Sequence, residues 1–269
     1  QVSSLVTDSA TGLPSDTATA TQTLGITVSA VPDAPVVTVG NAAGTEDTAM
    51  TLSIDVQPSG GVAVDSVTLT GVPAGATLTG ANGLSITSDG SDIALTADQL
   101  AGLQLTAPAD FSGTFDVGVS ATSVDGGTDT ATVGVTVNPD ADLPTLTATA
   151  DAGVEDTPIA LNIASAVTDT DGSEVVTSIT ISGIPDGASL ASGTSSIAVV
   201  NGVATFDPAL LTGLELTPAA NYNGSFDLQV SSLVTDSATG LPSDTATATQ
   251  TLGITVSAVP DAPVVTVGN

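Results

Sequence analysis

The sequence predicts an all-β protein in which small β-sandwich domains follow one another in a linear array. Three features support this prediction: segments in which Thr and Val alternate with other residues, frequent turn signals, and repeats at two length scales. The alternation suits half-buried strands. No stretch combines a sustained 3.6-residue apolar period with helix caps, so helices are expected to be minor.

A long repeat sets the organisation of the chain. Residues 229–269 are identical to residues 1–41, so the period is 228 residues and the 269-residue chain holds one period plus 41 residues of the next. An identical stretch of this length indicates recent duplication within a longer array. The chain is therefore expected to be an excerpt.

A second, diverged repeat lies within the period. GVPAGATL at 71–78 matches GIPDGASL at 183–190, and ADFSGTFDV at 109–117 matches ANYNGSFDL at 220–228. The expected segments are the C-terminal part of a preceding unit at 1–30, unit A at 31–137, unit B at 138–258, and the opening strand of the next unit A at 259–269.

Each unit is expected to form short strands, for example at 131–137 and 251–258. Asn201-Gly202 and Asp89-Gly90 are typical two-residue hairpin turns, and 95–103 and 207–214 are expected to hold one helical turn each. About seven strands in ~110 residues is typical of an immunoglobulin-like sandwich. Aromatic residues are few, so Val, Ile, Leu and Ala must form a thin core, which Phe115 and Phe226 are expected to join.

The composition excludes most catalytic chemistry. The chain has 29 acidic residues and no Lys, Arg, His or Cys. Ser-His-Asp and Cys-His arrangements, Schiff bases and ordinary zinc sites are therefore ruled out. Carboxylates, hydroxyls and backbone carbonyls remain, and these are the ligands of hard cations, above all Ca²⁺. We expect no enzyme activity.

The net charge of −29 also limits the partners. Binding to nucleic acids or anionic membranes needs Lys and Arg. No apolar run reaches ~18 residues, so no membrane insertion is expected, and the sequence does not open with a signal segment. The expected partners are neighbouring repeats of the same chain or fibre, with lateral or end-to-end self-association as a further option.

Acidic residues concentrate at the unit boundaries. Proline-flanked linkers carry some of them, Glu-Asp-Thr motifs carry others, and residues 169–174 form an acidic loop that resembles the first half of an EF-hand, although its remaining spacing does not fit. We expect a linker Asp, the Glu-Asp pair of the unit that follows, and a nearby acidic loop to converge on Ca²⁺. The candidate ligands are Asp33, Glu46, Asp47, Asp140, Asp142, Glu155, Asp156, Asp169, Asp171, Glu174 and Asp261.

The alternative is that these acidic residues cap turns, for which Asp and Asn are favoured without any metal. For Asp89, Asp125 and Asp236 this is the interpretation we adopt.

The stretches 154–190 and 216–230, with the closing VPDAP at 259–263, resemble the cadherin-like or bacterial immunoglobulin-like extender repeats of giant RTX adhesins. The resemblance implies Ca²⁺-rigidified extracellular domains of a Gram-negative biofilm adhesin, exported by type I secretion, that hold a terminal binding domain away from the cell. It implies calcium ligands at Glu155, Asp156, Asp169, Asp171 and Glu174, with Asp140, Asp142 and Asp261 in the linkers. Unit A departs from the pattern, since it keeps only Asp55 and Asp65 near the matching loop. The two junction types are therefore expected to differ in calcium load.

A carbohydrate-binding or ice-binding repeat module is the alternative function. A lectin site usually presents exposed aromatic residues, of which this chain has almost none to spare, and its Thr residues follow strand alternation and not the regular array of an ice-binding face. A two-carboxylate glycosidase would need a sugar cleft, usually lined with aromatic residues, and is not expected. The expected ends of the chain, at 1–30 and 259–269, also allow a filament subunit that assembles by strand complementation.

Overall fold

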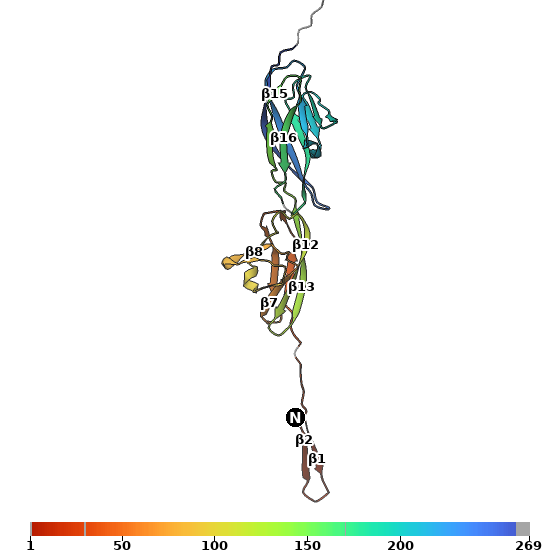
Figure 1. Ribbon diagram of the computed structural model, residues 1–269. Helices are drawn as coiled ribbons and strands as arrows, with labels where there is room; N and C mark the ends of the chain where they lie inside the picture. The colour runs from red at the N-terminus through yellow and green to blue at the C-terminus, as the bar shows by residue number, and fades with distance from the viewer. Residues whose placement is uncertain (1, 30, 170, 262–269) are drawn as a thin grey trace, which may run out of the picture.

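Each unit is a sandwich of two sheets in which buried residues alternate with solvent-facing ones along the strands. The computed structural model describes residues 2–29, 31–169 and 171–261. Figure 1 shows a hairpin, unit A and unit B following one another from the N-terminal end. The strands and their tandem arrangement confirm the predicted immunoglobulin-like, cadherin-like β-sandwich class.

Unit A has one five-stranded sheet of order β10-β7-β12-β13-β4 and one four-stranded sheet of order β5-β11-β8-β9, with the pair β3-β6 beside them. The elements are β3 (Val36–Gly40), β4 (Ala42–Thr45), β5 (Met50–Thr51), β6 (Ser53–Gln57), β7 (Val64–Thr70), β8 (Thr77–Thr79), η1 (Ala81–Gly83), β9 (Ser85–Thr87), β10 (Ile93–Leu95), η2 (Ala97–Leu100), β11 (Gln104–Thr106), β12 (Gly113–Ser123) and β13 (Thr128–Asn138).

Unit B repeats this design with sheets of order β15-β23-β22-β17-β20 and β14-β16-β21-β18-β19. Its strand β16 pairs with both β21 and β14. In unit A two strands share these pairings, since β5 pairs with β11 and β6 pairs with β3. The elements are β14 (Thr145–Ala150), β15 (Gly153–Val154), β16 (Ile159–Ala166), β17 (Glu174–Ser182), β18 (Ser189–Ser192), β19 (Ser195–Ile197), β20 (Val203–Phe206), η3 (Pro208–Leu211), β21 (Leu214–Thr217), β22 (Gly224–Asp236) and β23 (Asp244–Ser257).

The two units have separate cores made almost entirely of aliphatic side chains, as the composition predicts. Phe115 and Phe226 are half-buried and pack against the cores. Each lies edge-to-face against a second ring, Phe111 at 5.9 Å and Tyr222 at 5.7 Å between centroids. The expected role of Phe115 and Phe226 in the cores is confirmed.

The short strands β4 and β15 pair in parallel with the last strand of their own unit, β13 and β23. Parallel pairing makes both strands end at the same edge, so the residue after each short strand lies beside the linker that leaves the unit. The Glu46 N–H donates to the Asn138 carbonyl at 3.1 Å, and the Glu155 N–H donates to the Ser257 carbonyl at 3.0 Å.

At both predicted hairpin turns, Asn201-Gly202 and Asp89-Gly90, the strands on the two sides belong to different sheets. Asn201 and Gly202 both have positive φ, 52° and 75°, and close a bridge between Val200 and Val203, so the tight turn is confirmed. However, β19 pairs with β18 while β20 pairs with β17. The same holds around Asp89-Gly90, where β9 pairs with β8 and β10 pairs with β7. The expectation of simple hairpins at both sites was wrong, because the chain crosses there from one sheet to the other.

The expected helical turns at 95–103 and 207–214 are confirmed as the 3₁₀ helices η2 and η3. Thr96 and Gln99 form a capping box on η2, and the Asp207 carboxylate accepts the Ala209 N–H on η3. In the part of the chain that the structure describes, no helix is long and apolar enough to cross a membrane.

The N-terminal hairpin, β1 (Val2–Asp8) and β2 (Asp16–Gln22), repeats the sequence of β22 and β23 and keeps their register. Val2 pairs with Gln22 as Val230 pairs with Gln250. Every described residue from 2 to 29 is exposed, whereas Val230 and Val234 of the matching hairpin are fully buried. The expected opening strand at 259–269 lies mostly at 262–269, outside the described residues.

We expect Leu216→Ala, which empties a fully buried site in unit B, to cost about 2–5 kcal/mol of stability. Tyr222 is the only Tyr and the chain has no Trp, so tyrosine fluorescence during urea unfolding follows unit B. The matched control Val175→Ala removes a 53 % exposed side chain from β17 and is expected to cost about 1 kcal/mol or less. Equal losses in the two variants would contradict the assignment of this core.

Candidate metal centre at the junction of the two units

Three acidic residues lie side by side across the end of unit B that faces unit A. Glu174 at the start of β17 pairs with Asp236 at the end of β22, and Asp236 pairs with Asp244 at the start of β23. Like charges directly opposite one another on neighbouring strands are destabilising. This row of three paired acids, Glu174, Asp236 and Asp244, therefore needs positive charge or hydrogen-bond donors from outside the sheet.

The loop before β17 adds Asp169 to the same end of unit B. Its Oδ1 accepts the Asp171 N–H at 2.7 Å and its Oδ2 accepts the Ser173 hydroxyl at 2.9 Å. Gly172 has φ 93°, a left-handed conformation that glycine adopts without strain. The loop thus turns sharply and holds Asp169 in a buried position.

Unit A contributes Glu46, which the parallel pairing of β4 with β13 places beside the linker that follows its own unit. Its Oε1 accepts the Asp140 N–H at 2.7 Å. The expectation that a Glu-Asp pair serves the linker before its own unit was wrong for Glu46, because β4 ends at the C-terminal edge of the sheet.

The linker is held through its backbone amides. The Asp140 N–H also donates to Asp236 Oδ2 at 3.2 Å, and the Ala141 N–H donates to Asp244 Oδ2 at 3.1 Å. The Asp142 N–H donates to Glu174 Oε1 at 2.5 Å. Carboxylates from both units therefore accept hydrogen bonds from the backbone N–H groups of three consecutive linker residues.

Four acidic side chains at this junction, which we call the buried cluster, are at least nine-tenths buried. Three of them have an oxygen without a hydrogen-bond partner: Glu46 Oε2, Glu174 Oε2 and Asp236 Oδ1. Leaving a buried acceptor unsatisfied costs about 1–3 kcal/mol, and more when it is charged. The members are Glu46 (5 % exposed), Asp169 (7 %), Glu174 (5 %) and Asp236 (0 %).

Burial raises the pKa of Glu46 to about 8, and the facing carboxyl of Asp236 and the charge of Asp169 act in the same direction. Burial also raises the pKa of Asp169 and of Glu174 above their usual values. Asp171 and Asp110 add negative charge near Asp169, and Asp142 adds it near Glu174. The buried cluster therefore resists full ionisation.

Glu46 and Asp236 cannot hydrogen-bond to each other when both are ionised, since neither then carries a proton. A shared proton, a bridging water or a metal cation would satisfy both groups. In the described chain, no three His, Cys, Asp or Glu side chains are already grouped to hold an ion. The carboxylates would have to turn toward a common point to coordinate one. In Glu46, Glu174 and Asp236 one oxygen holds a linker amide, and the other oxygen has no hydrogen-bond partner. In charge and donor type, these residues fit a hard divalent cation.

The other predicted ligands occupy different positions. Asp47 and Asp156 both have positive φ, and their Oδ1 atoms accept the N–H of Asp110 and of Asn221 at 3.2 and 2.8 Å, so both fix loops in the way expected of turn caps. The matching carboxylate Glu155 is buried at the C-terminal end of unit B, away from the buried cluster. The side chains of Asp33, Asp140, Asp142, Asp171 and Asp261 are exposed.

Asp236 was wrongly interpreted as a surface turn residue, whereas Asp89 and Asp125 do cap exposed turns. Asp236 continues a strict alternation of buried residues along β22, from Leu228 to Val234. Extending that period by one step identifies its inward position. No sequence pattern points to Asp110 or Asp244 as junction residues, because both reach the junction only through contacts with residues distant in the chain.

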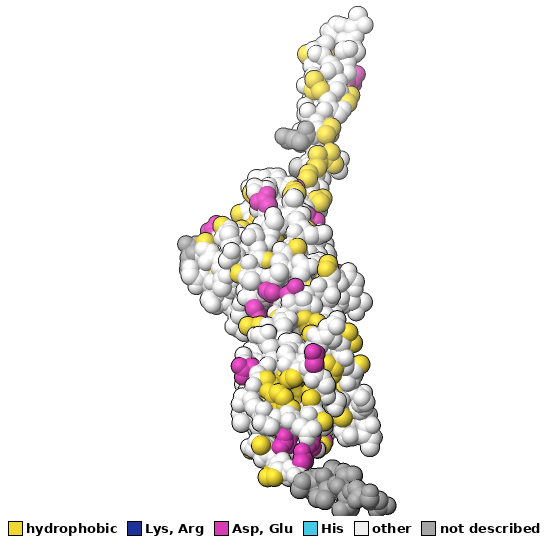
Figure 2. All heavy atoms as spheres, turned by 90° about the horizontal axis from the view of Figure 1, so that it is seen from above, with side chains coloured by type: hydrophobic (Ala, Val, Ile, Leu, Met, Phe, Trp, Pro, Cys, Tyr) yellow, Lys and Arg dark blue, Asp and Glu magenta, His cyan; other side chains and the backbone are white. Residues whose placement is uncertain are grey.

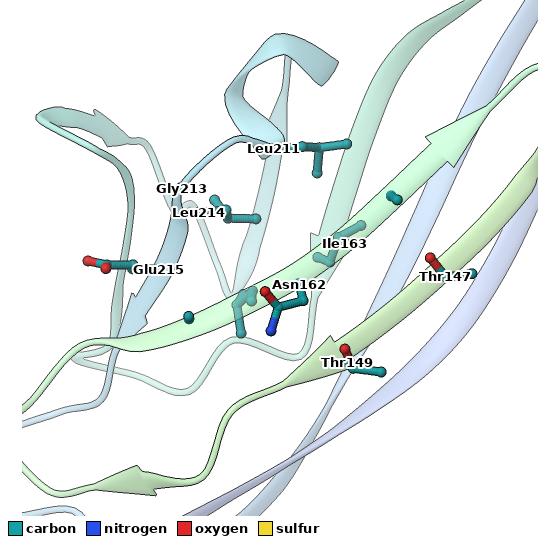
Figure 3. Close-up of a pocket in the computed structure, with 11 residues that line it drawn as sticks. Thr147, Thr149, Asn162, Ile163, Leu211, Gly213, Leu214 and Glu215 are labelled. Carbon is teal, nitrogen blue, oxygen red and sulfur yellow. The ribbon is translucent and has the colours of Figure 1, made fainter.

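Apart from the junction, a hollow of about 430 Å³ lies in unit B where β16 leaves β21 to pair with β14. Figure 3 shows its threonines and Asn162, with the Glu215 carboxylate directed away from them. Glu215 is the one titratable residue among the eleven that line it, so this hollow offers no acid pair. On the face shown in Figure 2, acidic side chains occur in patches along the units, and the chain has no basic residue to pair with them.

No model of a known protein family and no curated protein matches the chain. Solved structures that match it include the fibronectin(III)-like modules of Clostridium thermocellum CbhA, with 11 % identity, a TM-score of 0.26, and coverage of 83 % of this chain and 95 % of that chain. A protocadherin gammaB7 EC3–6 cis-dimer matches with 13 % identity and a TM-score of 0.39, covering 84 % of this chain and 48 % of that chain. Domains 4 and 5 of the S-layer protein SbsC match with 14 % identity and a TM-score of 0.24, covering 66 % and 93 %. Likeness at this level concerns the fold alone.

With metal removed by a chelator, we expect the free energy of unfolding to fall as the pH rises from about 4.5 to about 8. In that window the native Glu46 keeps a proton that the unfolded chain releases, so raising the pH favours unfolding. Thermal unfolding at about pH 6 and about pH 8.5 measures the difference, which Glu46→Gln is expected to reduce. The control Glu215→Gln removes an exposed carboxylate and should leave the difference unchanged. An equal reduction in both variants would show that overall charge, not the buried cluster, causes it.

Proposed function

We propose that this chain is a structural spacer segment of a secreted bacterial surface adhesin or extracellular fibre, and that Ca²⁺ at the junction of units A and B stiffens it. One observation carries the proposal: Glu46, Glu174 and Asp236 each have a buried carboxylate oxygen without a hydrogen-bond partner, at the point where two units and their linker meet.

The bound ion would supply the positive charge that this chain lacks in its side chains. The protein's own residues contribute from both sides of the joint. Glu46 comes from unit A, while Asp169, Glu174 and Asp236 come from unit B. Neutralising them together favours the arrangement in which the two units meet at this angle, so the joint loses freedom to bend.

The donor set favours calcium over other metals. Zinc sites normally use His or Cys, and the chain has neither. Mg²⁺ prefers a few carboxylates and several waters in octahedral geometry, whereas Ca²⁺ accepts six to eight oxygens in flexible arrangements. Exposed Asp140 and Asp142 in the linker, with Asp110 and Asp171 near Asp169, offer further oxygens.

The proposed setting is a tandem array in which units A and B alternate. The hairpin at residues 2–22 would be part of the last hairpin of a preceding unit B, whose remaining strands would cover the apolar side chains that are exposed here. A sandwich of this size spans roughly 35–45 Å, so each period would add about twice that to the reach of the fibre. Location on the surface of a Gram-negative cell and a role in biofilm attachment belong to this proposal, which rests there on the resemblance to RTX adhesins.

Strand complementation between separate chains is the second candidate, and the exposed hairpin favours it. Val2 and Val6 are 62 % and 64 % exposed, while their copies Val230 and Val234 are fully buried. A unit B that lacked its own last hairpin would accept residues 2–29 in the same register. This chain contains its own copy at 229–257, so exchange between two chains gains no new contacts, and we favour the continuous array.

Excess Ca²⁺ is expected to raise the melting temperature of the full chain by roughly 5–10 °C over chelator and to narrow its range of shapes in small-angle scattering. Glu174→Gln should weaken Ca²⁺ binding in calorimetry, yet raise the melting temperature in chelator, because it removes a repelling charge. Glu215→Gln, exposed on β21, is the matched control and should change neither. An unchanged melting curve and unchanged scattering with and without Ca²⁺ would overturn the proposal and leave the acidic residues as turn caps and surface charge.

A further inference from the structure

The 228-residue period contains two kinds of joint, and both are represented in this chain. The A-to-B joint is complete. The B-to-A joint is seen as two halves: the C-terminal end of unit B with residues 259–261, and the N-terminal end of unit A with the identical residues 31–33. The two joints can therefore be compared residue by residue.

At the C-terminal end of unit B, Glu155 has a partner for each carboxylate oxygen. Oε1 accepts the Val259 N–H at 2.5 Å, and Oε2 accepts the Asn223 amide at 3.3 Å. The first bond matches the one from the Asp140 N–H to Glu46 Oε1. Val259 therefore stands where the A-to-B linker has Asp140, which removes one carboxylate.

The second bond has no equivalent at the A-to-B joint. Ser112 follows Asp110 in unit A as Asn223 follows Asn221 in unit B, and its shorter side chain does not reach Glu46. Ser112 Oγ and Glu46 Oε2 are both buried without a hydrogen-bond partner. Unit B thus satisfies its glutamate with protein groups, and unit A does not.

The N-terminal end of unit A shows the same contrast. Asp125 lies as far after Phe115 as Asp236 lies after Phe226, but it is exposed and fully engaged. Its Oδ1 accepts the Ser123 hydroxyl at 2.6 Å and its Oδ2 accepts the Asp33 N–H at 3.0 Å. These hydrogen bonds lower the pKa of Asp125, in the opposite direction to the shift at Glu46.

The row of paired acids formed by Glu174, Asp236 and Asp244 in unit B is also absent from unit A. In unit A the pairing of β7 with β12 ends at Val64 and Ser123, so Asp125 lies beyond the paired strands, whereas Asp236 of unit B pairs with Glu174. Asp129 Oδ2 accepts the Val37 N–H at 2.9 Å. Gly127 packs so closely on the linker that a Cβ atom there would lie 2.5 Å from the Asp33 backbone carbon. Contacts between protein groups therefore hold the linker segment at the start of unit A by themselves.

We infer that cation-dependent and cation-independent joints alternate along the array, so that Ca²⁺ sites recur once per 228-residue period and not at every junction. The inference rests on the proposed calcium function and adds where that function acts. Removing Ca²⁺ would loosen each A-to-B joint and leave each B-to-A joint in place. The fibre would then become a string of rigid B–A pairs joined by soft hinges.

Amide hydrogen exchange by NMR on the full chain tests this inference, because each joint has reporter amides. Chelation is expected to speed exchange at Asp140 and Asp142 by about tenfold or more and to change exchange at Asp33 and Val37 by less than about twofold. Faster exchange at all four amides would overturn the alternation while leaving the calcium function standing. No change at any of them, with no Ca²⁺ binding in calorimetry, would overturn both.

Two matched variants sharpen the test. Asp236→Asn is expected to abolish the effect of Ca²⁺ on the Asp140 amide. Asp125→Asn, at the matching position of unit A, is expected to speed exchange at Asp33 equally with Ca²⁺ and with chelator. If Ca²⁺ restored slow exchange at Asp33 in Asp125→Asn, a cation would be acting at that joint and the inference would fail.

Discussion

Hydrogen bonds from linker amides to carboxylates are the interaction on which the arrangement of the two units depends. A chain without Lys, Arg or His has no cationic side chain to pair with its 29 acids, so backbone N–H groups are its most abundant donors. The linker between units A and B gives the N–H groups of three successive residues, Asp140 to Asp142, to carboxylates of both units. Each bond satisfies one carboxylate oxygen, and the second oxygen of Glu46, Glu174 and Asp236 has no hydrogen-bond partner. The need for a counter-charge follows directly from that shortage of donors.

The two units share a design in their sheets and differ at their ends. Matching strand orders, paired aromatic rings and the same Glu-Asp-Thr turn recur in both, as expected when a core must keep its packing. Asp236 of the buried cluster has Asp125 as its counterpart in unit A, but Asp125 is exposed and each of its carboxylate oxygens accepts a hydrogen bond. Divergence between the units has therefore changed the chemistry of the joints without changing the sandwich. In the proposed spacer, the residues that set the stiffness of the joint would therefore differ from those that stabilise each sandwich.

The sequence was sufficient for the fold class, because alternation and turn residues are local signals, and for the involvement of Glu46, Asp169 and Glu174 at a junction with the linker. It did not reveal which linker Glu46 serves, since that depends on the parallel pairing of β4 with a strand some ninety residues later. Asp236 was missed because its neighbours in sequence resemble a surface turn, although its place in the alternation of β22 points inward. The Asp89-Gly90 turn was misjudged because a turn signal does not specify whether the next strand joins the same sheet.

The hairpin at residues 2–22 has the register of its copy in β22 and β23, although its described residues are all exposed. Its strand pairing is thus encoded locally, and in a long array every such hairpin is an interchangeable part. Neighbouring domains of like sequence are prone to exchange strands while they fold, which is a characteristic failure of multidomain chains. In this chain unit A lies between the two identical hairpin sequences, so in the proposed array the nearest compatible acceptor for a newly made hairpin would be its own domain. In the proposed array, alternating two kinds of unit would therefore reduce misassembly while the chain is synthesised, apart from any effect on the finished fibre.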